Sequence, residues 1–300
     1  KVSIAKINEV TKANSKRVCG VVASSAAGGL LGIANINGAL AQPSFSTDYS
    51  LSLNGTNEYV NLGTLTNSVL QPTQSSINTS GFTMSAWVYF PSGAPTDYVI
   101  NLGQSGTNNY YGLKINVNTS RYVVVHVMGL NGSTPGAGTN NRNSIRTSST
   151  IPNNSWKHIA AVFPIGSMGS PMTRTSWKIY INGVEQNIGA LSGNQNMNLA
   201  YTGTSQIGAQ IRTSAQNFYS GQINNTAVWA QALTTSNLAA VYNSGTPIDL
   251  STNAGNYTNS AKLIAWWRFN EGTGTSYTDS SANSFTGSGV NTPTWSTNVP

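Results

Sequence analysis

Charged residues are scarce in this sequence. Of its 300 residues, 15 are Lys or Arg and 8 are Asp or Glu, so that 8% carry a charge, whereas an average soluble domain carries about 25%. The hydrophobic fraction of 38% is also below the usual ~45–50%. So little Glu and Lys excludes a coiled coil, whose helices carry these residues on their solvent-facing surface.

Cysteine and long apolar runs are also missing. Cys19 is the single cysteine, which excludes a scaffold stapled by disulfides. No apolar run reaches the ~20 residues that a membrane-spanning helix needs. A highly charged disordered chain is excluded as well, because 7 Trp and 13 Tyr supply large apolar side chains for a core. The length allows one large β domain or two small domains.

Uncharged polar residues take the place of the missing charge, and 37 of them are Asn. The net charge of +7 is unevenly spread along the chain. Residues 1–17 alone contribute +4, because they set Glu9 against five basic residues, namely Lys1, Lys6, Lys12, Lys16 and Arg17. We expect this basic block to dock on an acidic partner.

The N-terminal segment resembles a targeting sequence. A run of apolar and small residues spans 18–34, and Ala39-Leu40-Ala41 has the small-x-small form of a cleavage site. We interpret residues 1–42 as a retained docking arm and not as a signal, and because the chain starts at Lys1 we expect that something preceded it. The arm has too little bulk to form its own core, so we expect it to pack against another chain.

From about residue 43 the pattern is that of β-strands. Residues 82–90 alternate, and one face carries Phe82, Met84, Ala86, Val88 and Phe90. Further strands are expected at 122–128, 156–163, 177–181, 206–209, 218–229 and 263–269. Asn182-Gly183 predicts a tight hairpin, because a type I′ turn needs a positive φ at both central residues. Many short strands separated by turn residues indicate an all-β, two-sheet antiparallel sandwich.

One segment has a helical pattern. Residues 232–245 carry capping candidates at 234–236, apolar Leu238, Val241 and Tyr242 at helical spacing, and Gly245 as a stop. We expect a short helix of two turns that lies on an edge of the sandwich.

The order of these motifs resembles a known family. Phe82–Val88 reads FTMSAWV, Trp156–Ala160 precedes Ile179–Gly183, and the WWRF motif at 266–269 precedes a polar loop at 279–284. Together with 45–60 and 218–247, these motifs are similar to those of concanavalin-A-like, laminin-G-like domains. The resemblance implies a jelly-roll sandwich over residues 43–300. The two ends, IAKINEV and YNSGTP…WWRF…NVP, further resemble laminin-G-like virion surface proteins of marine bacteriophages.

Catalytic motifs are not found. Glucanases that share this sandwich use a Glu-x-Asp-x-(x)-Glu strand, and none of the four glutamates, Glu9, Glu58, Glu185 and Glu271, has an Asp two residues on. There is no Gly-x-Ser-x-Gly turn for a nucleophile. His126 and His158 lie inside strand patterns and far apart, which does not suggest zinc, and we interpret them as packed side chains. We therefore expect no catalytic residue and no enzyme activity.

Calcium is the open metal question. The resemblance implies that a calcium site on the rim is common, and calcium needs clustered oxygen ligands. Asp279 with the nearby Asn283 is the candidate pair, although Asn54 stands where the family commonly has an Asp. The alternative is that Asp279 caps a turn through its side chain. No other cofactor is expected.

Glycan binding is the activity that the residues favour. Sugars are recognised by aromatic faces with convergent amide and hydroxyl groups, and Tyr98, Tyr110 and Tyr111 lie beside Asn-Gly-Ser loops. The alternative places these tyrosines in the core, as is usual for aromatic residues of a sandwich. We assign six tryptophans to the core or the layer between the sheets, namely Trp87, Trp156, Trp177, Trp229, Trp266 and Trp267.

Nucleic acid is the other ligand that a basic protein suggests. Residues 98–184 contain seven basic residues and no acidic one: Lys114, Arg121, Arg142, Arg146, Lys157, Arg174 and Lys178. Strand alternation divides them between two faces and several loops, and no recognition motif is visible. The sequence therefore does not favour nucleic acid as a partner of the sandwich.

These observations predict a non-enzymatic virion surface protein, which is a capsid decoration, a fibre or an adhesin. We expect its arm of residues 1–42 to bind other virion proteins in a homo-oligomer or another multi-copy assembly. We expect its sandwich of residues 43–300 to face outward and to be capable of binding host surface glycans. The alternative is a secreted or cell-surface carbohydrate-binding module of a bacterium, which is extracellular.

Overall fold

The structure is a computed structural model, and it describes residues 45–64, 69–93, 97–103, 111–131, 134–135, 142–193, 196–201, 203–211 and 214–300. Thr47–Pro300 form one compact unit. The predicted arm of residues 1–42, with its basic residues Lys1, Lys6, Lys12, Lys16 and Arg17, lies outside the described residues.

The smaller of two antiparallel sheets has eight strands in the order β11-β10-β9-β3-β17-β1-β21, with β18 paired to β17. Its strands are β1 (Ser50–Asn54), β3 (Phe82–Tyr89), β9 (Trp156–Phe163), β10 (Lys178–Ile181), β11 (Val184–Glu185), β17 (Ser220–Trp229), β18 (Leu263–Trp267) and β21 (Thr294–Ser296). Asn182 and Gly183 connect β10 to β11 with φ values of 53° and 75°, which confirms the predicted tight hairpin.

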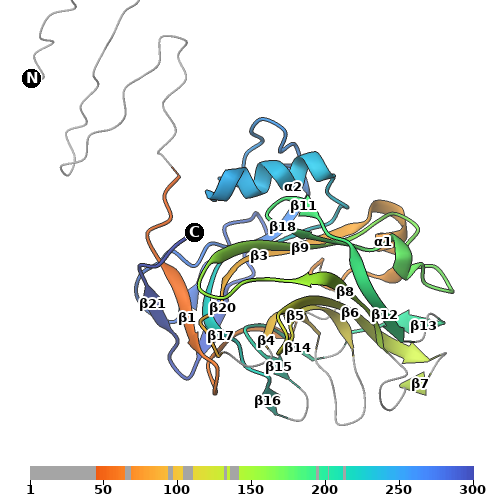
Figure 1. Ribbon diagram of the computed structural model, residues 1–300, viewed down its shortest axis with the longest axis horizontal. Coiled ribbons are helices and arrows are strands. Elements are labelled where there is room, and N and C mark those ends of the chain that lie inside the picture. The colour runs from red at the N-terminus through yellow and green to blue at the C-terminus, as the bar shows by residue number, and fades with distance from the viewer. Residues whose placement is uncertain are drawn as a thin grey trace, which may run out of the picture. The chain divides into compact units, whose positions relative to one another are not determined.

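The larger sheet has eleven strands in the order β12-β8-β6-β5-β4-β14-β2-β20-β19, with β13 and β7 paired to β6. Its strands are β2 (Tyr59–Thr64), β4 (Asp97–Leu102), β5 (Gly112–Val117), β6 (Tyr122–Asn131), β7 (Thr134–Pro135), β8 (Arg142–Thr150), β12 (Ile188–Gly193), β13 (Met197–Leu199), β14 (Thr204–Ile207), β19 (Ser276–Tyr277) and β20 (Gly287–Val290). The two sheets stack as two layers (Figure 1). This confirms the all-β, two-sheet sandwich.

The core lies between the two layers and is built from alternating strand residues. The side chains predicted to share one face of β3 all belong to it, namely Phe82, Met84, Ala86, Val88 and Phe90. Five of the six tryptophans assigned to the interior are buried. Trp156 is the exception, because it begins β9 and is only partly buried beside the ring of Tyr89, 5.8 Å away.

The predicted helix is confirmed as α2 (Thr235–Tyr242), which a capping box begins at Thr234. The Thr234 hydroxyl accepts a hydrogen bond from the Asn237 N–H, and the Asn237 side chain accepts one from the Thr234 N–H, both at 3.2 Å. The helix lies over the outer face of the smaller sheet (Figure 1), where Tyr242 stacks on Trp87 at 5.6 Å. It reaches the β10–β11 turn, where a side chain on Gly183 would approach Ala239 to 2.8 Å.

A second helix, α1 (Gln74–Ser80), is not predicted by the sequence. Ile77 is its one buried residue, so the segment has no repeating apolar face. Its caps hold it instead, because the Thr73 hydroxyl accepts from the Ser76 N–H at 3.0 Å and the Gly81 N–H donates to the Ile77 carbonyl at 2.7 Å.

The remaining elements are small. A hairpin of β15 (Gln210–Ile211) and β16 (Ala215–Gln216) follows β14, and single 3₁₀ turns occur at Arg174–Ser176, Asn243–Gly245 and Ser260–Lys262. Among the described residues, no helix has the length and apolar character that crossing a membrane requires.

Candidate functional site

The outer face of the larger sheet carries an unbroken line of polar residues. On β5, Leu113, Ile115 and Val117 belong to the core, so Lys114 lies on the opposite face. Strand register pairs Lys114 with Asn101 of β4 and with His126 of β6. Followed in both directions, the same register gives one polar residue on each strand from β12 to β19. We call this line the polar row: Ser192, Ser144, His126, Lys114, Asn101, Gln206, Asn61, Ser288 and Ser276.

The middle of the polar row is buried, from Ser144 to Gln206, whereas Ser192, Ser276 and Ser288 at its two ends are exposed. The Asn101 amide donates a hydrogen bond to Gln206 Oε1. In contrast, Asn101 Oδ1 and His126 Nδ1 are buried atoms without a hydrogen-bond partner among the described residues. Buried polar atoms are normally paired, so these two atoms are unpaired positions in the buried middle of the row.

His126 is held as a neutral imidazole. Burial lowers the pKa of His126 to about 3, and the positive charges of Arg142 and Lys114 act in the same direction. A neutral ring has one N–H, and Nε2 lies 2.8 Å from the acceptor Asn116 Oδ1. With the ring proton on Nε2, Nδ1 is an acceptor. Both unpaired atoms of the row are therefore hydrogen-bond acceptors.

Aromatic rings flank the polar row on the same face. Tyr98 of β4 is buried beside it, with its ring centroid 5.8 Å from Lys114 Nζ and 6.3 Å from the His126 ring. Tyr122 of β6 is partly exposed, and the Arg146 guanidinium lies 4.3 Å from its ring centroid. Aromatic rings, amides and cations thus gather on one face of the sheet, where Tyr122 and Arg146 are partly exposed. This combination of groups is the chemistry that recognises sugars.

The structure does not gather the three predicted tyrosines into one site. Tyr98 pairs with Asn116 near the end of β5, whereas Tyr111 immediately precedes Gly112 at the start of that strand. Five residues of strand separate the two positions, which corresponds to about 16 Å. Tyr110 lies outside the described residues. Of the three, Tyr98 alone is observed next to the polar row, and the role of all three in glycan binding stays a prediction.

The Asp279 carboxylate links a loop to β18 by hydrogen bonds. It is buried and accepts hydrogen bonds from the N–H groups of Trp266, Ser281 and Phe285 at 2.8–2.9 Å, and from the Ser281 hydroxyl at 2.8 Å. The Asn283 amide donates to the Ile264 carbonyl at 2.9 Å. Calcium at Asp279 and Asn283 stays a prediction, and an ion there would have to displace these donors. Across the described residues, no group of three His, Cys, Asp or Glu side chains is placed to hold a metal.

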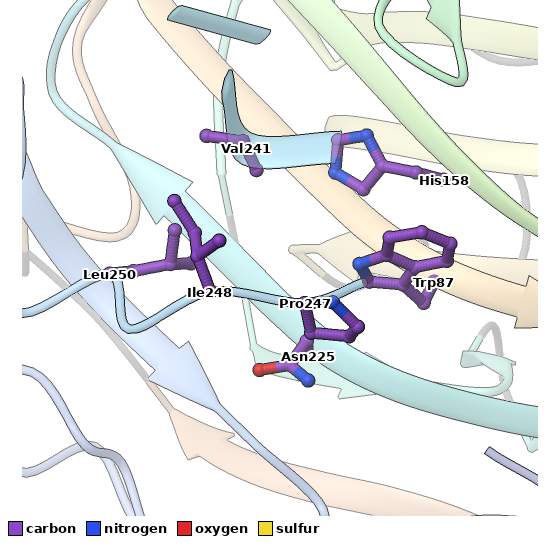
Figure 2. A pocket seen from close by; sticks show the side chains of 7 residues that line it. All are labelled: Trp87, His158, Asn225, Val241, Pro247, Ile248 and Leu250. Atoms are coloured by element: carbon purple, nitrogen blue, oxygen red, sulfur yellow. The ribbon is translucent and has the colours of Figure 1, made fainter. Parts of the chain in front are cut away.

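A small cavity lies on the other sheet, beneath α2. Figure 2 shows His158 and Trp87 on one side of it and Ile248 and Leu250 on the other, with Val241, Pro247 and Asn225 completing the lining. Its volume of about 10 Å³ has room for about one water molecule. Burial lowers the pKa of His158 to about 3, and its Nδ1 has no partner among the described residues. This cavity is too small for a sugar, so His158 is a packed residue of the interior.

A wider depression of about 410 Å³ runs along the edge strand β12. Thr175 and the β12 residues Ile188, Gly189, Ala190 and Leu191 line it. It offers neither an aromatic ring nor a charged group, so the outer face of the larger sheet has the better chemistry for recognising a polar ligand.

Sequence reasoning missed the polar row. Alternation places Lys114 and Asn116 opposite Leu113 and Ile115, and this signal was readable from the sequence. The alignment of Lys114 with Asn101 and His126 was not readable, because it depends on the register between strands far apart in the chain. Of the basic residues in 98–184, Lys114, Arg142 and Arg146 share the outer face of the larger sheet, whereas Lys157 and Lys178 belong to the smaller sheet.

Two stacked antiparallel sheets, with a short helix and a polar outer face, define the class of concanavalin-A-like sandwich proteins. A laminin-G family model, described as the concanavalin A-like lectin/glucanases superfamily, matches residues 54–239. Because this match covers more than half of the chain, the chain belongs to that family. No curated protein matches the sequence.

Several solved structures are similar to this chain at low sequence identity. A protein of Bacteroides ovatus to which carbohydrate binding has been attributed is 13% identical with a TM-score of 0.52, and the match covers 85% of this chain and 62% of that protein. The heptameric SAP-like pentraxin of Limulus polyphemus is 18% identical with a TM-score of 0.42 over 65% of this chain and 82% of its own. The CBM40 of Ruminococcus gnavus IT-sialidase, bound to α2,3-sialyllactose, is 11% identical with a TM-score of 0.45 over 64% and 96%.

Proposed function

We propose that the sandwich binds glycans on the outer face of the larger sheet and does so without catalysis. The observation that carries this proposal is the partly exposed Tyr122 ring with the Arg146 guanidinium 4.3 Å from its centroid, next to the buried, unpaired acceptors of the polar row, Asn101 Oδ1 and His126 Nδ1. They flank the ammonium group of Lys114 by strand register. Sugar hydroxyls both donate and accept hydrogen bonds, so a saccharide on the Tyr122 ring is able to accept from the Arg146 guanidinium and to donate toward the polar row.

Tyr122→Ala is expected to weaken glycan binding about tenfold, because loss of one aromatic contact surface costs on the order of 1 kcal/mol or more. Tyr122 is only partly buried, so the fold should persist. The measurement is binding of the full chain to a glycan array, followed by calorimetric titration with the best ligand. Tyr89→Ala is the matched control, since Tyr89 is a partly buried tyrosine of the smaller sheet.

Equal loss of affinity in both variants would contradict a site on the larger sheet. The proposed contacts Tyr98 and Tyr111 are tested in the same titration, with Tyr111→Ala reporting whether the site extends to the other end of β5. Hydrolysis of the bound glycan would overturn the non-catalytic part of the proposal.

The arm of residues 1–42 carries the second part of the proposed function, which is attachment of a virion surface protein to its particle. Two observations favour it: the block of +4 in residues 1–17 and the resemblance of both chain ends to phage virion proteins. In this function the five basic residues pair with acidic groups of other virion proteins, and the sandwich of residues 43–300 is presented outward at the virion surface in many copies, as a capsid decoration, fibre or adhesin.

Deletion of residues 1–42 is expected to leave a folded sandwich that no longer joins the particle, because Thr47–Pro300 form a compact unit of their own. The measurement is the amount of the chain in purified particles, with circular dichroism of the truncated chain as the control for folding. Retention of the truncated chain at full copy number would show that the arm does not dock it.

A secreted or cell-surface carbohydrate-binding module of a bacterium is the competing function. It is favoured by the family, whose fold also occurs in the solved protein of Bacteroides ovatus described above. Particle incorporation separates the two functions, since a secreted module remains free while a virion protein sediments with the particle.

A further inference from the structure

Cations collect on the part of the candidate binding face that β5, β6 and β8 form. Lys114 of β5 and Arg142 and Arg146 of β8 lie on the outer face of the larger sheet, where strand register pairs Arg142 with Met128 and Arg146 with Val124 of β6. Both arginines are partly exposed. The four strands β5, β6, β8 and β12 contain no Asp or Glu at all.

Two of these cations are held in fixed positions. The Arg146 guanidinium lies over the Tyr122 ring at 4.3 Å, and such stacking orients the planar group while leaving its N–H donors available at the edge. Lys114 is fully buried, with its ammonium 5.8 Å from the Tyr98 ring centroid. A guanidinium in this setting binds carboxylate or sulfate oxygens in a bidentate manner.

All the charged side chains on these four strands are positive. The pKa of His126, which lies between Lys114 and the β8 arginines, is lowered first by burial and then by the charges of Arg142 and Lys114. Arg142 and Arg146 are four residues apart on one strand face, which corresponds to about 13 Å. That separation is suited to two charged groups of an extended chain rather than to one group of a monosaccharide.

We propose that the glycan bound by this face is an acidic polysaccharide, whose carboxylate or sulfate groups pair with Arg142 and Arg146 while its hydroxyls reach the polar row. This proposal rests on the glycan-binding function proposed above and names its ligand class. Carboxylate and sulfate share the chemistry that a guanidinium recognises, and the test below distinguishes them.

The test compares four polymers against the full chain: polygalacturonate for carboxylates, heparin for sulfates, dextran as the neutral polysaccharide, and duplex DNA as the competing polyanion. Binding to polygalacturonate, heparin or both is expected, with at least a tenfold loss of affinity from about 0.05 M to about 0.5 M salt, because added ions screen exposed charges. The double variant R142Q/R146Q is expected to lose at least tenfold in affinity. The charge-matched double variant K157Q/K262Q, outside the larger sheet, is expected to bind as the parent does.

Binding to dextran that neither salt nor R142Q/R146Q reduces would overturn the acidic ligand class and leave the glycan-binding function standing. Binding to none of the polysaccharides would overturn both. Binding to DNA that exceeds binding to the acidic polysaccharides would also overturn the proposal. Equal losses in the two double variants would show a general effect of net charge and not a site on this face.

Discussion

Asp279→Ala is expected to lower the free energy of unfolding by about 4 kcal/mol. The buried carboxylate accepts hydrogen bonds from three backbone N–H groups, those of Trp266, Ser281 and Phe285. Truncation leaves these donors without a partner, and each unsatisfied buried donor costs about 1–3 kcal/mol. The measurement is equilibrium unfolding in urea at neutral pH, followed by tryptophan fluorescence.

Asp249→Ala is the control for this substitution. Asp249 accepts from the N–H and hydroxyl of a single neighbour, Ser251, at an exposed position, so a loss below about 1 kcal/mol is expected. Equal effects of the two substitutions would contradict this stabilising role of the Asp279 carboxylate. Urea unfolding with and without added calcium tests the calcium prediction. A rise of the unfolding midpoint with calcium that Asp279→Ala abolishes would assign an ion to the Asp279 carboxylate.

Acidification is expected to destabilise the sandwich through its two buried histidines. The pKa values of His126 and His158 are both lowered to about 3 in the folded state, whereas an unfolded histidine titrates near pH 6.5. Between these values the unfolded chain binds more protons, so stability rises with pH, is complete above about pH 6.5 and is lost as the pH falls toward 3. At about pH 4.5 the expected loss is about 2–3 kcal/mol per histidine.

Urea midpoints measured across this pH window check the prediction. His126→Gln and His158→Gln each remove one titrating group, so each variant should lose about half of the pH dependence while retaining the fold at neutral pH. Glu58 opposes the trend in part, because burial raises the pKa of its carboxyl. A pH dependence that neither substitution reduces would assign the acid sensitivity to other groups.

The sandwich was readable from the sequence because its signals are local. Alternation over 82–90 correctly predicts five side chains in the core. Asn182-Gly183 forms the predicted hairpin turn with positive φ at both residues. Thr234 begins α2 through a capping box. Each of these features depends on residues a few positions apart. The sequence does not predict the helix α1, because two caps and one buried residue, Ile77, stabilise it and leave no periodic pattern.

The candidate site could be predicted from the sequence only in part, because its residues lie on strands that are distant in the chain. The sequence indicates Tyr98 as a candidate. It does not indicate that Lys114 and His126 lie next to Tyr98, because strand register brings these residues together. His126 was interpreted as a packed residue, and its burial agrees with that interpretation. The strand pattern does not indicate that His126 Nδ1 lacks a hydrogen-bond partner among the described residues. A partner for this atom would come from another strand, and the pairing of distant strands is not visible in the sequence.

The first and last strands of the sandwich lie side by side, since β1 pairs with β21. The Ser50 hydroxyl donates to the Asn298 carbonyl at 2.7 Å, across 248 residues of sequence. Contacts of such span close very large loops and slow folding. The smaller sheet therefore cannot be completed until β21 has left the ribosome, and until then β1 keeps an open edge on which a second nascent copy is able to pair.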